Sequence, residues 1–210
     1  MLQEMEAAFA ARGRTPKGRE ARKKIFQAAL AAMTSSGAHG ASLETIASTA
    51  GLTQAALRHH FPTRDELLTA VFTTATVWFR SRLARIVANT RVPAAARLQM
   101  CIESHLEFME SVDSVFWLEG SAYWIRTAPN RRVRNEFYRW MVNEYALMIG
   151  ELRPDLRKPE RQGKAFVLVS LVLGSWVTHG RGSAWHRDFN AGHRRKLLVQ
   201  SAMDLVAVIG

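Results

Sequence analysis

The chain has 210 residues, of which 48% are apolar, and its 29 Lys and Arg outnumber 18 Asp and Glu to give a net charge of +11. This apolar fraction excludes a disordered chain, and a single cysteine excludes a disulfide framework or a multi-cysteine metal site. The most apolar run, residues 165–177, is shorter than the roughly 20 residues that cross a bilayer, and no secretory signal is visible, so we expect a cytoplasmic protein without membrane contact.

Residues 1–18 are predicted to form a flexible basic arm, because Pro16 and Gly18 interrupt the chain before the first strong helical pattern. Basic residues cluster at the end of this arm and at the start of the helix that follows. The cluster contains Arg12, Arg14, Lys17, Arg19, Arg22, Lys23 and Lys24, against one acid, Glu20. A segment of this charge can follow a phosphate backbone or enter a minor groove.

A first helix is predicted over residues 19–36, where apolar residues recur at the spacing of one buried helix face. These residues are Phe26, Ala29, Leu30 and Met33. Gly37 and Gly40 are placed to end the helix, because glycine readily adopts the left-handed conformation found at helix ends. The pattern therefore predicts one amphipathic helix that packs against whatever follows it.

Two short helices joined by a tight turn are predicted next. Ser42 is a candidate N-cap for the first of them, Gly51 ends it, and Thr53 caps the second, over about residues 54–60. The residues that would seal the inside of this unit are Leu52, Leu57 and Phe61. Helix, turn and helix in this order are typical of a helix-turn-helix motif.

The outer face of the second short helix carries the side chains that point to a function. That face presents Gln54, Ala55, Arg58 and His59. Gln and Arg can form paired hydrogen bonds with adenine or guanine edges in a major groove. Residues suited to contact or position phosphates are Lys17, Ser42, Thr53, His59, His60 and Arg64, and the free N–H groups of the helix that starts at Arg64 add an anion site. We therefore expect a DNA interface here.

Residues 19–68 resemble the DNA-binding domain of TetR-family transcriptional regulators, whose pattern is T-x-x-x-I-A-x-x-A-G-V-S-x-x-x-L-Y-x-H-F-x-S-K-x-x-L. The matching residues are Ser42, Ile46, Ala47, Ala50, Gly51, Leu52, Thr53, Leu57, His60, Phe61, Thr63, Arg64 and Leu67. Arg64 replaces the usual lysine and keeps its charge. Arg58 stands where the family has an aromatic residue, so it can contact either a base or a phosphate.

Only helices are predicted in the rest of the chain, because no alternation of period two is visible. They cover about residues 64–89, 93–111, 115–127, 131–152, 159–179 and 193–209. We expect an all-α fold with a helix-turn-helix domain over residues 19–66. The resemblance implies that residues 67–210 form a helical bundle for ligand binding and dimerisation.

The resemblance also implies a homodimer, in which two recognition helices about 34 Å apart read a palindromic DNA operator. Two apolar helices near the C-terminus supply a candidate surface, since Ser170 and Gly174 form a pair of small residues that allows close helix approach. The expected interface residues are Val169, Ser170, Leu173, Gly174, Leu198 and Leu205. Together, two such helices from each subunit would form a four-helix bundle.

The aromatic-rich middle of the chain is the candidate site for an unknown small-molecule effector, because pockets in helix bundles are mostly apolar with a few polar groups. The expected lining residues are His105, Met109, Trp117, Tyr123, Trp124, Trp140 and Trp176. Residues 115–129 also resemble the choline-responsive BetI-like branch of the family. By family resemblance, the effector would release a repressor from DNA, although activation is the open alternative. Any one of these aromatic residues could instead belong to the core.

No catalytic, cofactor or metal site is expected, because the motifs of P-loop, serine-hydrolase and zinc-protease sites are absent from the sequence. His179, His186 and His193 recur every seven residues but lie in and around a glycine-rich loop. Cys101 lies in an apolar helix and is expected to be buried. The alternative to a regulator is an all-helical ligand-binding or scaffold protein whose basic surface meets another polyanion.

Overall fold

The computed structural model describes residues 1–111, 118, 120, 123, 125, 128–178 and 190–207. Over these residues the chain forms nine helices and no strand, which confirms the all-α prediction. The chain divides into two compact units: unit 1 comprises Met1–Phe79 and Val115–Val133, and unit 2 comprises Arg80–Ser114 and Arg134–Gly210. No helix in the described part of the chain has the length and apolarity that crossing a membrane requires.

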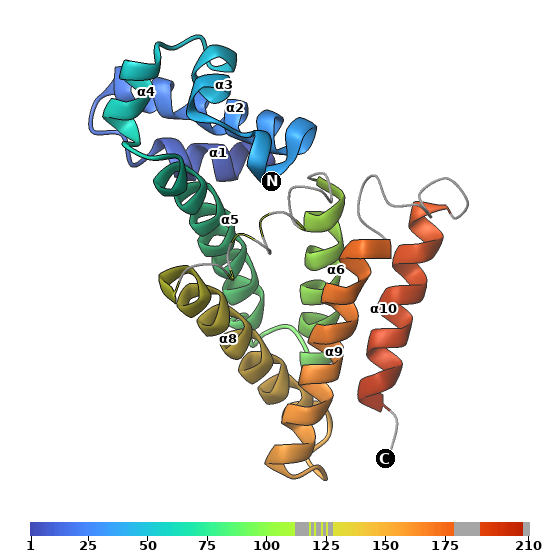
Figure 1. Cartoon of the computed structure of the whole chain (residues 1–210). Helices are drawn as coiled ribbons and strands as arrows, with labels where there is room; N and C mark the ends of the chain where they lie inside the picture. Colours follow the sequence, from blue (N-terminus) through green and yellow to red (C-terminus); the bar gives the residue numbers. More distant parts are fainter. Residues whose placement is uncertain are drawn as a thin grey trace. The chain divides into compact units, whose positions relative to one another are not determined.

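Unit 1 contains four helices that precede the long helix α5 (Arg64–Val87). They are α1 (Leu2–Ala10), α2 (Pro16–Gly40), α3 (Leu43–Thr49) and α4 (Gln54–His60). Helix α2 packs against α1 and α3, and α3 packs against α4 (Figure 1). The predicted bounds of α4 are confirmed at both ends. Gly37 adopts a φ of 65° near the end of α2, where the sequence predicts that the helix ends.

The prediction that residues 1–18 form a flexible arm is wrong. Half of this segment is helix α1, whose Met5 and Phe9 side chains are 1% and 0% exposed, so apolar burial holds it in place. Helix α2 also begins earlier than predicted, at Pro16, with the Thr15 hydroxyl accepting a hydrogen bond from the first turn at 3.0 Å. Proline fits the first turn because its missing N–H would have no helical partner there.

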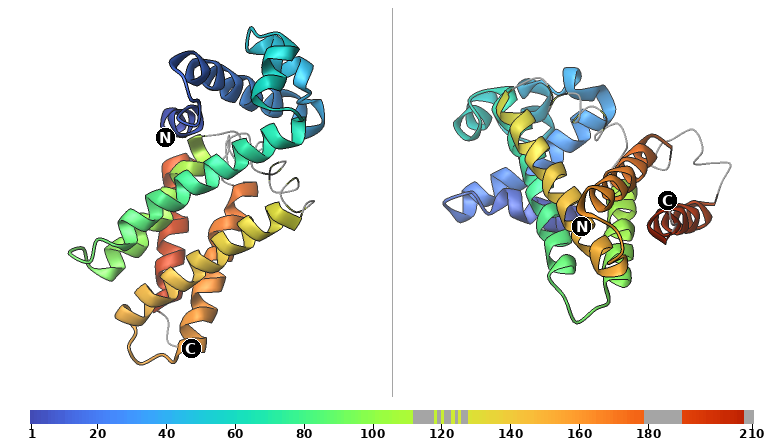
Figure 2. Two further views of the ribbon diagram at one scale, coloured as in Figure 1. Left: turned by 90° about the vertical axis from the view of Figure 1, so that its left-hand side faces the viewer. Right: turned by 90° about the horizontal axis from the view of Figure 1, so that it is seen from below.

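Unit 2 contains the end of α5 and four further helices or parts of them. They are α6 (Ala94–Ser111), most of α8 (Ala128–Leu152), α9 (Lys158–Thr178) and α10 (Ala191–Ala207). Helices α6, α9 and α10 pack on one another in pairs and lie side by side (Figures 1 and 2). Their buried residues include Leu98, Ile102, Leu106, Leu168, Val172, Ala202 and Val206. The first boundary between the two units falls after Phe79, within α5, whereas the predicted domain boundary follows residue 66.

Arg97 fastens the connection between α5 and α6 inside unit 2. Its guanidinium donates hydrogen bonds to the carbonyl oxygens of Val87 and Val92 at 2.9 and 3.0 Å, and to the Glu151 carboxylate at 2.5 Å. Carbonyl oxygens at a helix end lack intrahelical partners, so the buried Arg97 guanidinium satisfies one in the last turn of α5 and links this turn to α8.

The predicted helix over residues 115–127 lies outside the described residues, except for residues 118, 120, 123 and 125.

Candidate nucleic-acid interface

The turn between α3 and α4 depends on Gly51. Its φ of 66° lies in the left-handed region, and an added Cβ would meet no atom within 4 Å, so backbone conformation rather than lack of space requires glycine. The N–H of Leu52 closes the turn by donating a hydrogen bond to the carbonyl oxygen of Ala47 at 2.9 Å. Ala47 and Ala50 are buried beside the turn, which lets the two short helices approach closely. The predicted helix-turn-helix geometry is therefore present.

Each short helix begins at a hydroxyl side chain, as the sequence predicts. The Ser42 hydroxyl accepts a hydrogen bond from the N–H of Thr45 at 3.0 Å, and the Thr53 hydroxyl accepts one from the N–H of Ala56 at 3.1 Å. A hydroxyl that accepts in this way keeps its own hydrogen. Thr53 is exposed, so it can cap α4 and still donate to a phosphate oxygen, while Ser42 is half-buried.

The outer face of α4, defined as Gln54, Ala55, Arg58 and His59, is exposed at all four positions. The opposite side of the helix is closed, because Leu57 is 0% exposed in the core of unit 1. Within the part of the chain that the structure describes, the side chains of Gln54 and Arg58 make no hydrogen bond or ion pair. Both therefore keep their donors available for a molecule that approaches from solvent.

Three further residues predicted to contact phosphates belong to unit 1. Lys17 is exposed in the first turn of α2, and Arg64 is half-buried at the first position of α5. His60 is half-buried at the last position of α4, and its burial, followed by repulsion from Arg22 and His59, lowers its pKa. A lowered pKa leaves His60 neutral at neutral pH, so it can offer an N–H to an anion but no positive charge.

The residues predicted to line an effector pocket are distributed over both units and over the part of the chain that the structure does not describe. His105 and Met109 are buried in α6 and Trp140 is half-buried in α8, all in unit 2, whereas Tyr123 belongs to unit 1. Trp117 and Trp124 lie outside the described residues, as does the side chain of Trp176. The ring of Trp140 already faces a cation, since the guanidinium carbon of Arg80 lies 5.0 Å from its centroid.

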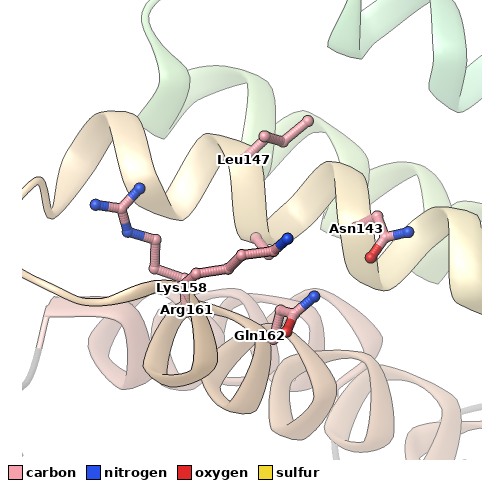
Figure 3. A pocket seen from close by; sticks show the side chains of 6 residues that line it. Asn143, Leu147, Lys158, Arg161 and Gln162 are labelled. Carbon is pink, nitrogen blue, oxygen red and sulfur yellow. The ribbon is translucent and has the colours of Figure 1, made fainter.

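A cleft of about 590 Å³ lies between α8 and α9 and differs in character from the predicted aromatic pocket. It is lined by Asn143, Ala146, Leu147, Lys158, Arg161 and Gln162, none of which the sequence predicts (Figure 3). Arg161 is partly engaged, because its guanidinium donates to the carbonyl oxygens of Leu156 and Pro154 at 2.6 and 3.2 Å. The cleft is therefore open and lined by two basic side chains, Lys158 and Arg161, and the second of these already bonds to the main chain.

Helix α9 carries an exposed apolar face, which differs in one respect from the predicted dimer surface. Ser170 and Gly174 are exposed, and Leu173, Leu198 and Leu205 are half-buried, but Val169 is only 5% exposed and belongs to the core of unit 2. The prediction for Val169 is therefore wrong, because this side chain has little surface left to offer. Sequence reasoning missed three apolar residues that do lie on the exposed side, namely Phe166, Val167 and Val177, at 62%, 46% and 61% exposure. Their spacing from Gly174 is helical and could have identified them.

The structure also bears on the single cysteine and on the three regularly spaced histidines. Cys101 is 0% exposed, as predicted, and burial raises the pKa of its thiol to about 12, so the thiolate that oxidation requires is scarce. His193 is exposed near the start of α10, while His179 and His186 lie outside the described residues. Over the described residues, no group of three potential ligands could hold a metal ion.

Residues 25–71 match the family model described as bacterial regulatory proteins, tetR family. This range covers most of α2, all of α3 and α4, and the first turns of α5. The HTH-type transcriptional regulator PksA of Bacillus subtilis (strain 168) is 32% identical over 103 residues, which make up 49% of this chain and 50% of PksA. The chain thus spans about half the length of this relative.

Solved structures extend the similarity to both units as a shared fold. SCO4454, a TetR-family transcriptional regulator from Streptomyces coelicolor, matches with a TM-score of 0.73 and 18% identity over 94% of this chain and 92% of its own. A Saccharomonospora viridis protein in complex with choline matches with a TM-score of 0.70 and 21% identity over 86% and 94% of the two chains. Residues 25–71 therefore match the tetR family of bacterial regulatory proteins, and the chain as a whole shares the fold of these solved regulators.

Proposed function

We propose that the protein is a DNA-binding transcriptional regulator whose helix α4 reads base edges in a major groove. The observation that carries this proposal is the exposed outer face of α4. There Gln54 and Arg58 bond to no other side chain in the described part of the chain, while Leu57 on the inner face is fully buried. Glutamine and arginine pair with adenine and guanine edges in a major groove, and each such pair contributes about 1–3 kcal/mol of discrimination. Ala55 adds a small apolar contact surface between them.

A ring of polar and basic groups would hold α4 in register on the phosphate backbone. Lys17 supplies a cation, Thr53 an exposed hydroxyl and His60 a neutral N–H donor. Arg64 supplies a second cation at the N-terminus of α5, and Ser42 lies at the corresponding end of α3. Contacts of this kind fix orientation and carry no sequence information.

Two subunits are proposed to pair through the exposed face of α9 together with α10. Phe166, Val167 and Val177 expose large apolar surface on α9, and Leu197 does so on α10 at 49% exposure. Gly174 leaves open space where a side chain would stand, which allows a second helix to approach. To read two half-sites, the two copies of α4 in such a homodimer would have to lie about one DNA turn, roughly 34 Å, apart.

A small molecule is proposed to control the DNA-binding state, with release of a repressor from its operator as the expected outcome. The choline found in the Saccharomonospora viridis structure makes quaternary ammonium compounds the first class to test. Aromatic rings attract such cations, and the middle of this chain is rich in aromatic residues. To empty an operator, the ligand must prefer the non-binding state by about 5.5 kcal/mol if it shifts a 1:99 equilibrium to 99:1.

Selection of bound duplexes from a random pool by the full chain tests the proposed function. The expected result is one enriched sequence with two inverted half-sites, whose centres lie about 10 base pairs or a multiple of this apart. Sedimentation of the complex is expected to show an even number of chains per duplex. Equal recovery of all duplex sequences would contradict the proposal, because phosphate contacts alone would then account for binding.

A further inference from the structure

A cluster of three side chains joins α1 to the end of α4 within unit 1. Arg22 of α2 lies against the rings of both Phe9 and Phe61, with its guanidinium carbon 4.6 Å from each centroid. The two rings also stack on each other, with centroids 5.6 Å apart and planes inclined by 24°. Phe61 is the residue at which α4 ends, and its N–H donates to the carbonyl of Leu57 at 2.9 Å.

Arg22 depends on α1 for its environment. Its side chain is 9% exposed, and it forms no ion pair with a carboxylate among the described residues. Its Nε instead donates to the main-chain carbonyl of Phe9 at 3.0 Å, and the two aromatic faces provide the remaining stabilisation. A buried cation needs such partners, and α1 supplies the carbonyl and one of the two rings.

Other contacts fasten α1 along α2. The Phe9 ring also packs on Phe26, with centroids 5.1 Å apart. The Glu6 carboxylate accepts a hydrogen bond from Gln27 at 2.6 Å and lies 3.4 Å from the Lys23 ammonium. Helix α1 is therefore held at several points, and Phe9 is the residue that reaches through to α4.

We propose that α1 is a brace for the recognition helix, and that Phe9 and Arg22 are positioning residues that act on DNA selectivity through Phe61. This inference rests on the proposed function. Helix α4 has only seven residues, and helices this short are not stable on their own, so packing at its two ends fixes where its outer face lies. Reading bases demands placement within about 0.5 Å. Neither Phe9 nor Arg22 needs to touch DNA for this effect.

The test compares full-length variants on the selected duplex and on a scrambled duplex of the same length. Phe9→Ala is expected to lower affinity for the selected duplex about tenfold, the size of one mismatched base pair, and to leave affinity for the scrambled duplex and its salt dependence unchanged. Arg22→Met, which keeps the aliphatic stem and removes the cation, is expected to act in the same direction. Met5→Ala is the matched control, because Met5 is equally buried on α1 but lies outside the cluster of three.

The ratio of the two affinities separates positioning from simple stability, because partial unfolding lowers both affinities together. Thermal unfolding of each variant sets an assay temperature at which it is folded, and Arg22→Met decides the question if Phe9→Ala does not fold. If the ratio of affinities is unchanged in the folded variants, or falls equally in Met5→Ala, Phe9 and Arg22 do not position α4. The proposed function would still stand. A wild-type protein that does not distinguish the two duplexes would overturn both.

Discussion

The hydroxyl of Tyr123 donates a hydrogen bond to the main-chain carbonyl of Asp65 at 3.2 Å, in the first turn of α5. The Tyr123 ring also lies near Phe72, with centroids 6.0 Å apart, and an added Cβ at Gly120 would collide with the Phe72 ring. Tyr123 is also one of the residues predicted to line an effector pocket. Its hydroxyl attaches it to the start of α5, directly after Arg64.

Replacing Tyr123 with phenylalanine tests the strength of this attachment. Tyr123→Phe keeps the ring and removes only the hydroxyl, so the free energy of unfolding is expected to fall by about 1 kcal/mol, the usual contribution of one hydrogen bond. Chemical denaturation of the full chain measures it. Tyr138→Phe in unit 2 is the control, and an equal loss in both variants would argue against a specific role for the bond to Asp65.

Lys17 is expected to act on DNA through charge alone. Lys17→Ala should weaken binding to all duplexes by a similar factor and should lower the slope of log affinity against log salt by about 1 per subunit, because one fewer counterion is released. Titrations at several salt concentrations measure that slope. Arg157→Ala removes a cation from unit 2 that is 82% exposed, and it should leave the slope unchanged. A loss confined to one duplex sequence would contradict a phosphate contact at Lys17.

The exposed face of α9 is expected to hold the dimer together. Phe166→Glu introduces a charge where 62% of an aromatic side chain is exposed, and burying an unpaired charge is costly, so the variant should sediment as a monomer at concentrations where the wild type is a dimer. Leu147→Glu, at 65% exposure on α8, is the matched control and should remain dimeric. A wild-type monomer would contradict the proposed dimer, and dissociation caused only by Leu147→Glu would place the interface elsewhere.

His105 is expected to make stability depend on pH. Burial lowers its pKa to about 3, while a hydrogen bond to the main chain of Cys101 opposes this shift in part. The unfolded chain binds a proton at this side chain near pH 6.5, whereas the folded chain does so only near pH 3. The free energy of unfolding should therefore fall as the pH drops from about 6.5 towards 3, and it should not depend on His105 above this range.

His105→Gln is expected to remove this part of the pH dependence. Denaturation at pH 7, 5 and 4 should show a smaller fall for the variant than for the wild type. His193→Gln replaces an exposed histidine of α10 and should behave as the wild type does. Parallel curves for all three proteins would show that His105 is not the group responsible.

The parts of unit 1 that sequence could predict depend on local chemistry. Thr53 at an N-cap, Gly51 in a left-handed turn and Leu57 on an inner face are each recognisable from a few neighbouring residues, and α4 begins and ends where they predict. Helix α1 was missed for a different reason. Phe9 of this helix is buried against Phe61, which lies 52 residues further along the chain, so no local pattern shows that α1 has a packing partner. In addition, Pro16 was interpreted as a break in the chain, although it begins a helix.

The C-terminal part shows where sequence patterns become ambiguous. Helix α9 is apolar on several sides, so apolarity alone did not distinguish Val169, which is buried in the core, from Phe166, which is exposed; only the spacing from Gly174 separates the two. Aromatic residues raised the same difficulty, because helical spacing does not distinguish a core side chain from one that lines a cavity. Trp140 shows this, since its ring is engaged by Arg80 within the chain itself.

The most direct test of DNA reading by α4 is base discrimination by Arg58→Ala. Binding of the wild type and the variant is measured on every single-base substitution of the selected duplex. If Arg58 reads a guanine, the variant should lose about 1–3 kcal/mol of discrimination at one position in each half-site and keep its preferences elsewhere. If discrimination is unchanged at every position in Arg58→Ala and also in Gln54→Ala, α4 does not read the DNA sequence, and the account is contradicted.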